Sequence, residues 1–201
     1  MRSRCRVVAA RRNSATQCPE ALRAQPWRPL ESAPTVIRLA NSSDVGDIAR
    51  LHVKAWQSAY RGHMPDAYLD ALEPFQRVAL WSKAIAQPGT FVLAAEEQRA
   101  IVGFCSLLPS RDADASPAVA EITAIYVDPA RVRSGVGSSL IEAALEIART
   151  KSFVEVTLWV LTGNLSARAF YEARGFEPDG TTKTEQRPGF SIHEIRYRRQ
   201  S

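Results

Sequence analysis

The sequence has few of the residues that build disulfide frameworks or zinc sites. Its 201 residues include only three cysteines and three histidines. Cys5 and Cys18 lie near the N-terminus and Cys105 falls in a strand pattern, so a reduced, cytoplasmic protein is the simplest interpretation. No histidine lies close to a pair of cysteines in the sequence, and we therefore expect no metal site.

Long apolar stretches are also missing. No window approaches the roughly 18 apolar residues of a membrane-spanning helix, so the sequence predicts no membrane partner. The formal net charge is +5, but residues 1 to 34 hold seven arginines against Glu20 and Glu31, while residues 35 to 201 hold 19 basic and 19 acidic residues. Because the excess charge lies in the first 34 residues, we expect no nucleic-acid partner.

The composition divides the chain into two regions. Residues 1 to 34 are rich in Arg, Pro, Ser and Gln and show no apolar periodicity, so we expect a disordered basic extension. Residues 35 to 201 contain the apolar patterns and are long enough for one hydrophobic core. The sequence therefore predicts a single folded domain over residues 35 to 201.

The most informative stretch is a strand, a glycine-rich turn and a helix in succession. Residues 119 to 127 are β-branched and aromatic, and the strand pattern ends at Asp128-Pro129. Apolar residues then recur at helical spacing from Val136 onward, so a helix begins near Gly135. A helix start carries unpaired N–H groups and the positive end of the helix dipole, which together bind anions such as phosphate.

Two common phosphate-binding motifs fit this turn poorly. The dinucleotide fingerprint G-x-G-x-x-G would need a third glycine where Leu140 stands, and its acidic residue would fall at Glu155, which starts a strand pattern. A P-loop would need Gly-Lys-Ser/Thr after the turn, and none follows. Arg131 and Arg133 flank the turn and could add charge-assisted contacts to a bound phosphate.

Two blocks of the sequence resemble the GCN5-related N-acetyltransferase (GNAT) family. The first is Tyr126-Val127-Asp128-Pro129 followed by Arg133-Ser134-Gly135-Val136-Gly137, which is similar to the family's acetyl-CoA-binding motif Q/R-x-x-G-x-G/A. Val132 stands at the first position of that motif. The second block runs from Asn164 through Phe170-Tyr171 to Gly175-Phe176 and is similar to N-x-x-A-x-x-F-Y-x-x-x-G-F. The resemblance spans about residues 35 to 199.

The resemblance implies a fold, a donor and a set of site residues. The fold is α/β, a single domain with a mixed, mostly antiparallel sheet of six to seven strands flanked by helices, and the donor substrate is acetyl-CoA. Tyr171 matches the family tyrosine that faces the cofactor sulfur and is the candidate acid. Trp56 and Tyr60 lie in the segment that covers the acceptor pocket. The implied cofactor-binding residues are Ile125, Tyr126, Val127, Val132, Arg133, Ser134, Gly135, Val136, Gly137, Ser138 and Asn164.

The rest of the chain reads as short alternating elements. Asn41 to Asp44 offer cap residues for a helix, and Pro65 opens a second helical stretch that we expect to continue to about Ala86. Asn164 stands where it could cap a short helix as readily as contact a cofactor. The other expected elements are strands at 35 to 40, 91 to 95, 101 to 108 and 154 to 161, a turn at 96 to 99, a loop at 111 to 117, a helix at 164 to 173 and a last hairpin over 176 to 197.

Transfer of an acetyl group from a thioester to a primary amine needs a base for the amine and a proton for the leaving thiolate. Glu121, on the central strand, is the candidate base acting through a water; the alternative is a carboxylate that faces solvent. Asp128 is a weaker candidate. We expect direct attack by the amine in a ternary complex, with a homodimer left open. The alternative function is a non-catalytic acyl-CoA-binding or sensing protein of the same fold.

Overall fold

The computed structural model describes residues 34–201, which fall within one compact unit. The predicted extension, residues 1 to 34, lies outside the described residues except for its last residue. No helix among the described residues is long and apolar enough to cross a membrane.

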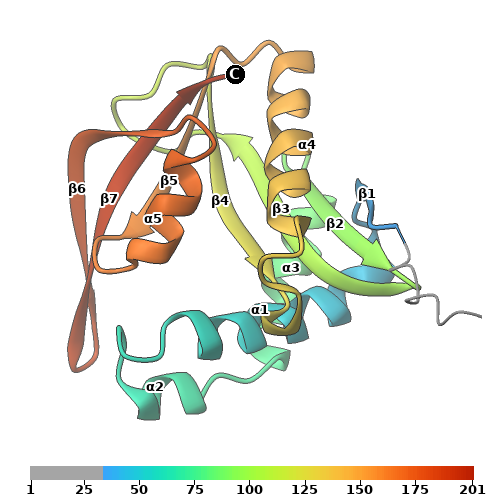
Figure 1. The fold of residues 1–201 in the computed structure, drawn as a ribbon, viewed down its shortest axis with the longest axis vertical. Helices are drawn as coiled ribbons and strands as arrows, with labels where there is room; N and C mark the ends of the chain where they lie inside the picture. Colours follow the sequence, from blue (N-terminus) through green and yellow to red (C-terminus); the bar gives the residue numbers. More distant parts are fainter. Residues whose placement is uncertain (1–33) are drawn as a thin grey trace, which may run out of the picture. The chain divides into compact units, whose positions relative to one another are not determined.

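The described residues form one seven-stranded sheet in the order β1-β2-β3-β4-β5-β7-β6 (Figure 1). All neighbouring strands are antiparallel except β4 and β5, which are parallel. The prediction of a mixed, mostly antiparallel sheet of six to seven strands is confirmed. The strands are β1 Val36–Leu39, β2 Phe91–Glu97, β3 Ala100–Pro109, β4 Val119–Val127, β5 Glu155–Leu161, β6 Glu177–Arg187 and β7 Phe190–Gln200.

Helices cover both faces of the sheet. On one face the apolar side of α4 packs against the central strands in the main core, together with Tyr171 and Phe176. On the other face α1 and α3 enclose a second cluster around Trp81 and Phe104. The helices are α1 Val45–Ala59, α2 Asp66–Asp70, α3 Phe75–Ala86, α4 Val136–Thr150 and α5 Leu165–Glu172, with short 3-10 turns η1 Ser42–Asp44 and η2 Pro129–Arg131.

Local sequence signals explain most helix starts. Asn41 accepts a hydrogen bond from the Ser43 N–H, while the Asp44 side chain accepts one from the Asn41 N–H, a reciprocal cap. Gly135, at φ +92°, is the residue before α4 and adopts a left-handed conformation that favours glycine. Asn164 caps α5 by accepting a bond of 3.0 Å from the Ala167 N–H.

Two boundaries differ from the sequence expectation. The single helical stretch expected from Pro65 to about Ala86 is two helices, because the chain leaves α2 at Ala71 and restarts after Pro74. Proline fixes its own φ and disfavours helix at the preceding residue, which explains the break. The turn expected at 96 to 99 is shorter, since β2 continues to Glu97 and only Gln98 and Arg99 take positive φ.

Two irregularities open the centre of the sheet: a β-bulge in β4 and the separation of β4 from β5. β4 pairs Ala124 with Ser106 and Ile122 with Leu107 of β3, so Thr123 has no residue opposite it. On its other side β4 pairs with β5 over only four residues, ending at Ile122 and Leu158. Beyond that point the two strands separate, and the gap opens toward the C-terminal ends of both strands.

Candidate active site

A cavity of about 790 Å³ occupies the region where β4 and β5 separate. Its walls come from β4 and β5, the last turns of α1, the loop before α4, the start of α4, and α5. A concave site at the carboxyl ends of diverging parallel strands is a common position for ligands in α/β folds. The predicted residues that line it are Tyr60, Ile125, Tyr126, Val127, Val132, Arg133, Gly135, Gly137, Ser138, Asn164 and Tyr171.

One end of the cavity is suited to an anion. The first hydrogen bond of α4 runs from the Ser139 N–H to the Gly135 carbonyl, and no described residue accepts from the N–H groups of Val136, Gly137 or Ser138. A Cβ at Gly135 would meet nothing within 4 Å, so the approach to these groups is open. The free donors and the helix dipole favour a phosphate there.

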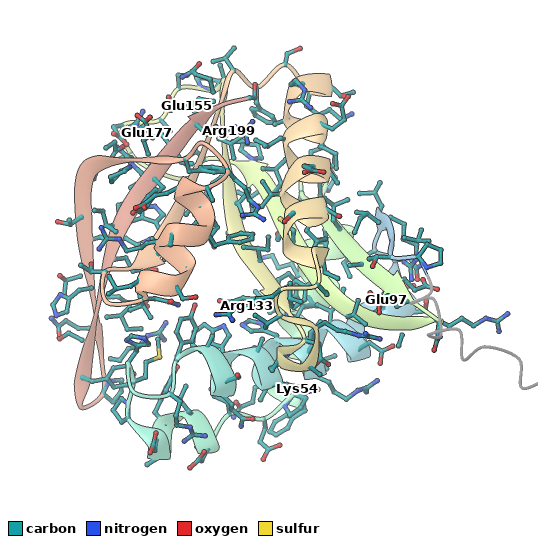
Figure 2. The ribbon with its side chains drawn as sticks, viewed as in Figure 1. Lys54, Glu97, Arg133, Glu155, Glu177 and Arg199 are labelled. Atoms are coloured by element: carbon teal, nitrogen blue, oxygen red, sulfur yellow. The ribbon has the colours of Figure 1, made fainter. Side chains whose placement is uncertain are left out.

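Arginines supply positive charge around this helix start. Arg133, at φ +66°, lines the cavity and lies in the loop before α4 (Figure 2). Arg131 also lines it and forms an ion pair of 2.9 Å with Glu97. Arg174 reaches over from the end of α5, donates to Ser138 Oγ, and lies 3.8 Å from the centre of the Phe170 ring. Its Nε is buried and has no hydrogen-bond partner among the described residues.

Tyr171 lies on the buried side of α5 and faces the cavity. Its side chain is 9% exposed and its ring packs edge-to-face with Phe170 and Phe176. Burial raises the pKa of the Tyr171 hydroxyl far above its usual value, and the neighbouring Tyr60 phenol and Cys105 thiol raise it further. The phenol therefore keeps its proton at neutral pH and can act only as a hydrogen-bond or proton donor toward a developing anion.

The opposite wall carries a pair of tyrosines. The hydroxyls of Tyr60, the residue that ends α1, and Tyr126 on β4 are 3.1 Å apart. Burial is the main cause that raises the pKa of each phenol. Behind Tyr126, at a ring-centre distance of 5.2 Å, lies His52, whose Nδ1 accepts a bond of 3.0 Å from Trp81 Nε1. Burial and the charge of Arg77 lower the pKa of His52 to about 3, so this imidazole is neutral.

Glu121 does not line the cavity. Its side chain is buried, and Arg111 holds it with bonds of 2.8 Å and 3.1 Å from the guanidinium and 3.3 Å from the backbone N–H. The sequence-based alternative of a solvent-facing carboxylate is therefore wrong. Thr123, two residues further along the same strand, and Trp159 on β5 both line the cavity.

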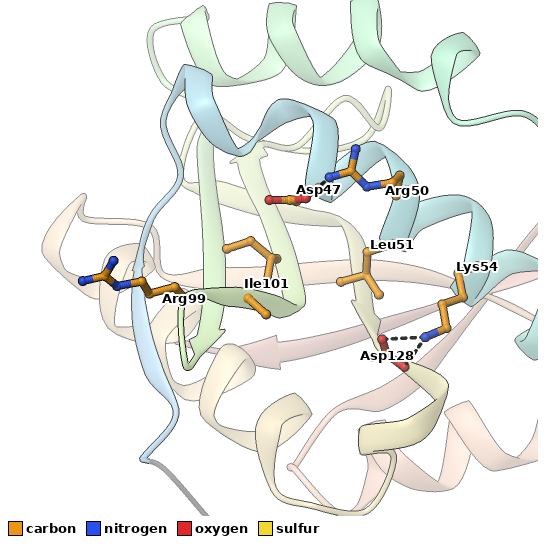
Figure 3. Close-up of a pocket in the computed structure, with 8 residues that line it drawn as sticks. Asp47, Arg50, Leu51, Lys54, Arg99, Ile101 and Asp128 are labelled. Atoms are coloured by element: carbon orange, nitrogen blue, oxygen red, sulfur yellow. Dashed lines mark hydrogen bonds and ion pairs between the residues drawn. The ribbon is translucent and has the colours of Figure 1, made fainter.

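Asp128 has a structural role at the end of β4. Both of its oxygens lie 2.8 Å from Lys54 Nζ, and one of them also accepts from the Ala130 N–H (Figure 3). The ion pair and the backbone bond outweigh burial and lower the pKa of Asp128. A second cavity of about 310 Å³ adjoins it, lined by Asp47, Arg50, Leu51, Lys54, Arg99, Ala100, Ile101 and Asp128. Asp128 thus fixes the strand exit and does not face the main cavity.

Three of the predicted cofactor- or substrate-binding residues do not line the cavity, and other residues that do line it were not predicted. Val136 is buried in the main core, Ser134 Oγ donates to the Arg131 carbonyl, and Trp56 packs edge-on against Tyr60. No group of three or more potential metal ligands occurs among residues 34 to 201. The lining residues without a predicted role are Ala55, Ser58, Ala59, Ile122, Thr123, Ala124, Pro129, Trp159, Val160, Ser166, Ala167, Ala169, Phe170 and Arg174, whereas Arg131 was predicted as a phosphate contact.

The fold and cavity define an acyltransferase that uses a CoA thioester, because they combine an anion-binding helix start with a buried phenol at the gap between two strands. Residues 48–176 match the family model of the acetyltransferase (GNAT) family. The chain belongs to this family, and it is an acetyl-CoA-dependent N-acetyltransferase.

Curated relatives and solved structures agree with this assignment. The uncharacterized N-acetyltransferase YuaI of Bacillus subtilis is 32% identical over 137 residues, which cover 68% of this chain and 77% of YuaI. The probable N-acetyltransferase Rv2775 of Mycobacterium tuberculosis is 28% identical over 168 residues, which cover 81% of this chain and 91% of Rv2775. Among structures, PaiA N-acetyltransferase of Thermoplasma acidophilum in complex with coenzyme A has a TM-score of 0.64 at 18% identity, covering 84% of this chain and 99% of that one.

Proposed function

We propose that this acetyltransferase transfers the acetyl group to a primary amine by direct attack within a ternary complex. The supporting observation is one continuous cavity that reaches from the start of α4, past Tyr171, to Tyr60 and Trp159. A cavity of this kind can hold the donor and the acceptor at the same time, so no covalent relay through the protein is needed.

The cysteine content argues against an acyl-enzyme. Cys105 is fully buried and does not line the cavity, and burial raises the pKa of its thiol to about 12. A thiol of this kind is not a nucleophile at neutral pH. The free, buried thiol also suits a reducing compartment such as the cytoplasm.

The cavity residues divide into a donor end and a reaction centre. We assign the pyrophosphate of acetyl-CoA to the N–H groups of Gly137 and Ser138, with Arg133 and Arg174 adding positive charge. When bound, acetyl-CoA supplies the activated thioester. Tyr171 then donates its proton to the sulfur as the C–S bond breaks, and the phenol is restored by the proton that the attacking nitrogen loses when the amide forms, because burial disfavours a tyrosinate.

The proton of the acceptor ammonium needs a separate route. No carboxylate among the described residues lines the cavity. We propose that Glu121 receives this proton through a water once one of its oxygens is released by Arg111. The arginine side chain is 66% exposed on a loop, so it has room to move into solvent, whereas Glu121 is fixed on the central strand.

An assay of coenzyme A release over a panel of amines tests the proposal. Initial-rate kinetics should give intersecting lines when both substrates are varied, as expected for a ternary complex, and no burst of coenzyme A should occur without an amine. Binding of acetyl-CoA with no turnover on any amine would instead support a sensing role. The same assay on residues 35 to 201 alone tests our proposal that this region is the complete catalytic domain.

A further inference from the structure

A lysine of β6, Lys183, packs on a residue of the cavity wall without lining the cavity itself. Lys183 Nζ lies 4.1 Å from the centre of the Trp159 ring and 3.4 Å from Glu194 Oε2. An ammonium this close to an indole face is in cation–π contact, and the carboxylate adds an ion pair. Trp159 lines the cavity, so the ring that holds the lysine is also part of the site wall.

The sheet register explains why these three side chains meet. Trp159 and Leu161 share one face of β5, Glu194 of β7 is paired with Leu161, and Lys183 of β6 is paired with Glu194. The indole edge is fixed because Trp159 Nε1 donates a bond of 3.0 Å to Asp112. The ring and the carboxylate are thus held by a paired sheet, while the lysine is at the end of a flexible stem.

Glu194 does not line the cavity, but it lies close enough to act electrostatically on Tyr60, which does. Its negative charge contributes to the raised pKa of the Tyr60 hydroxyl, after the larger effect of burial. The tip of the β6–β7 hairpin lies beside α2, where the ring centres of Tyr68 and Phe190 are 4.9 Å apart (Figure 1).

We propose that Trp159 and Glu194 form a binding site for a second ammonium group of the acceptor, and that Lys183 occupies this site until an acceptor displaces it. The inference rests on the proposed function and names its substrate class, the aliphatic diamines and polyamines. An ammonium held by an indole and a carboxylate keeps its proton, so it cannot be the nitrogen that attacks. The reacting nitrogen must therefore be a different amine of the same molecule.

The position of Lys183 makes displacement reasonable. Its side chain is 44% exposed and its ion pair is long, at 3.4 Å, so the lysine is weakly held. An incoming ammonium makes the same contacts, and the lysine regains solvent. The intramolecular lysine thus acts as a competitor that weakens acceptor binding.

The first experiment compares straight-chain monoamines with diamines of two to six carbons in the full-length protein. Because the ammonium site is at a fixed place relative to the thioester, kcat/KM for the diamines should pass through an optimum in chain length and exceed that of the matched monoamine. A steady change with length, or equal values for mono- and diamines, would overturn the proposal. A lysine-containing peptide in the same panel shows whether a side-chain ammonium on a larger molecule is preferred, an outcome that would replace the small-molecule acceptor.

The second experiment removes the competitor. Lys183→Met should lower KM for the optimal diamine by between about twofold and thirtyfold, the range of one cation–π contact. The matched control is Lys151→Met, because Lys151 lies 5.5 Å over Phe91, outside the cavity, and its removal should not change the ratio of diamine to monoamine kcat/KM. A KM for the diamine that rises in Lys183→Met would show that the lysine supports the acceptor site and would overturn the competition.

The third experiment removes the ammonium site itself. Glu194→Gln keeps the shape of the side chain and should raise KM for diamines while the monoamine KM changes little. Calorimetry with acetyl-CoA on the same variant separates this from failure of the proposed function, since donor binding should be intact. If the unmodified protein binds acetyl-CoA but turns over no amine, the proposed function is overturned. If Glu194→Gln loses kcat/KM equally for monoamines and diamines, only the ammonium site is overturned.

Discussion

Replacing Tyr171 with phenylalanine isolates a single hydroxyl group. The ring contacts with Phe170 and Phe176 are kept, and no described residue forms a hydrogen bond to the hydroxyl that is lost. The variant should therefore be as stable as the unmodified protein, because an unpartnered hydroxyl contributes no net hydrogen-bond energy. Affinity for acetyl-CoA should also hold, since the donor-binding groups lie at the start of α4.

The rate should fall steeply in the same variant. A positioned general acid accelerates proton transfer by about 10² to 10⁴, so Tyr171→Phe should raise the barrier by about 2.7 to 5.4 kcal/mol. Because burial raises the pKa of this phenol far above 7, the loss should be nearly constant across neutral pH. Single-turnover release of coenzyme A, followed with a thiol reagent at saturating amine, measures the chemical step without product release.

A second tyrosine provides the matched control. Tyr197 is fully buried, but its hydroxyl donates to Glu172 at 2.7 Å and accepts from Arg168 at 3.0 Å. Tyr197→Phe should lose about 1 to 3 kcal/mol of folding free energy and keep its single-turnover rate below the melting range. If Tyr171→Phe turns over at the unmodified single-turnover rate, the phenol is a packing residue and the assigned acid role is refuted.

Four further outcomes follow from the same structure. Gly135→Glu should abolish acetyl-CoA binding in calorimetry, because it places a negative charge and a side chain at a left-handed residue before α4. Gly103→Ala should cost about 1 to 3 kcal/mol in denaturant unfolding, since its Cβ would lie 2.9 Å from a methyl carbon of α4. Burial lowers the pKa of His52 to about 3, so the stability that depends on a neutral His52 is fully present above pH 6.5 and is lost as the pH falls toward 3. The free energy of unfolding should fall by about 1.4 kcal/mol per pH unit in this range. His52→Phe should remove this slope, whereas His63→Gln should leave it unchanged. Glu121→Gln should slow turnover most near neutral pH and recover partly at high pH, where the free amine is abundant, and a uniform loss at every pH would argue against a base.

Local patterns predicted the parts of the site that lie close together in the sequence. The strand through Val127, the break at Pro129 and the helix start at Gly135 each depend on neighbours within about four residues, so composition and spacing are sufficient to predict them. Asn164 was expected either to cap a short helix or to contact the cofactor, and it caps α5 and also lines the cavity. The two sequence blocks also sufficed for the family, since they occur in order and are separated by one strand.

The site residues that the sequence could not predict are placed by contacts between distant parts of the chain. Trp159 lines the cavity because β5 diverges from β4 beyond Leu158, and no local signal marks where two strands stop pairing. Arg174 reaches the start of α4 across 36 residues of sequence, and its place just before Gly175 in the second block was the only hint. The Arg111–Glu121 ion pair joins a loop to a strand, so a carboxylate that seemed free for chemistry is partly committed to structure.

The junction between β4 and β5 is the weakest in the centre of the sheet, because the two strands pair over a short length. Four residue pairs join these two strands, whereas seven join β3 to β4 and seven join β5 to β7. The sheet therefore consists of two more fully paired parts, one made of β1 to β4 and the other of β5, β7 and β6. Local opening should begin at the junction between β4 and β5. An acetyl-CoA molecule that contacts both α4 and α5 links the two parts across this junction. Amide exchange near Ile122 and Leu158 should then slow when acetyl-CoA binds, although neither residue belongs to the phosphate site, and the catalytic gap would gain its rigidity from the substrate.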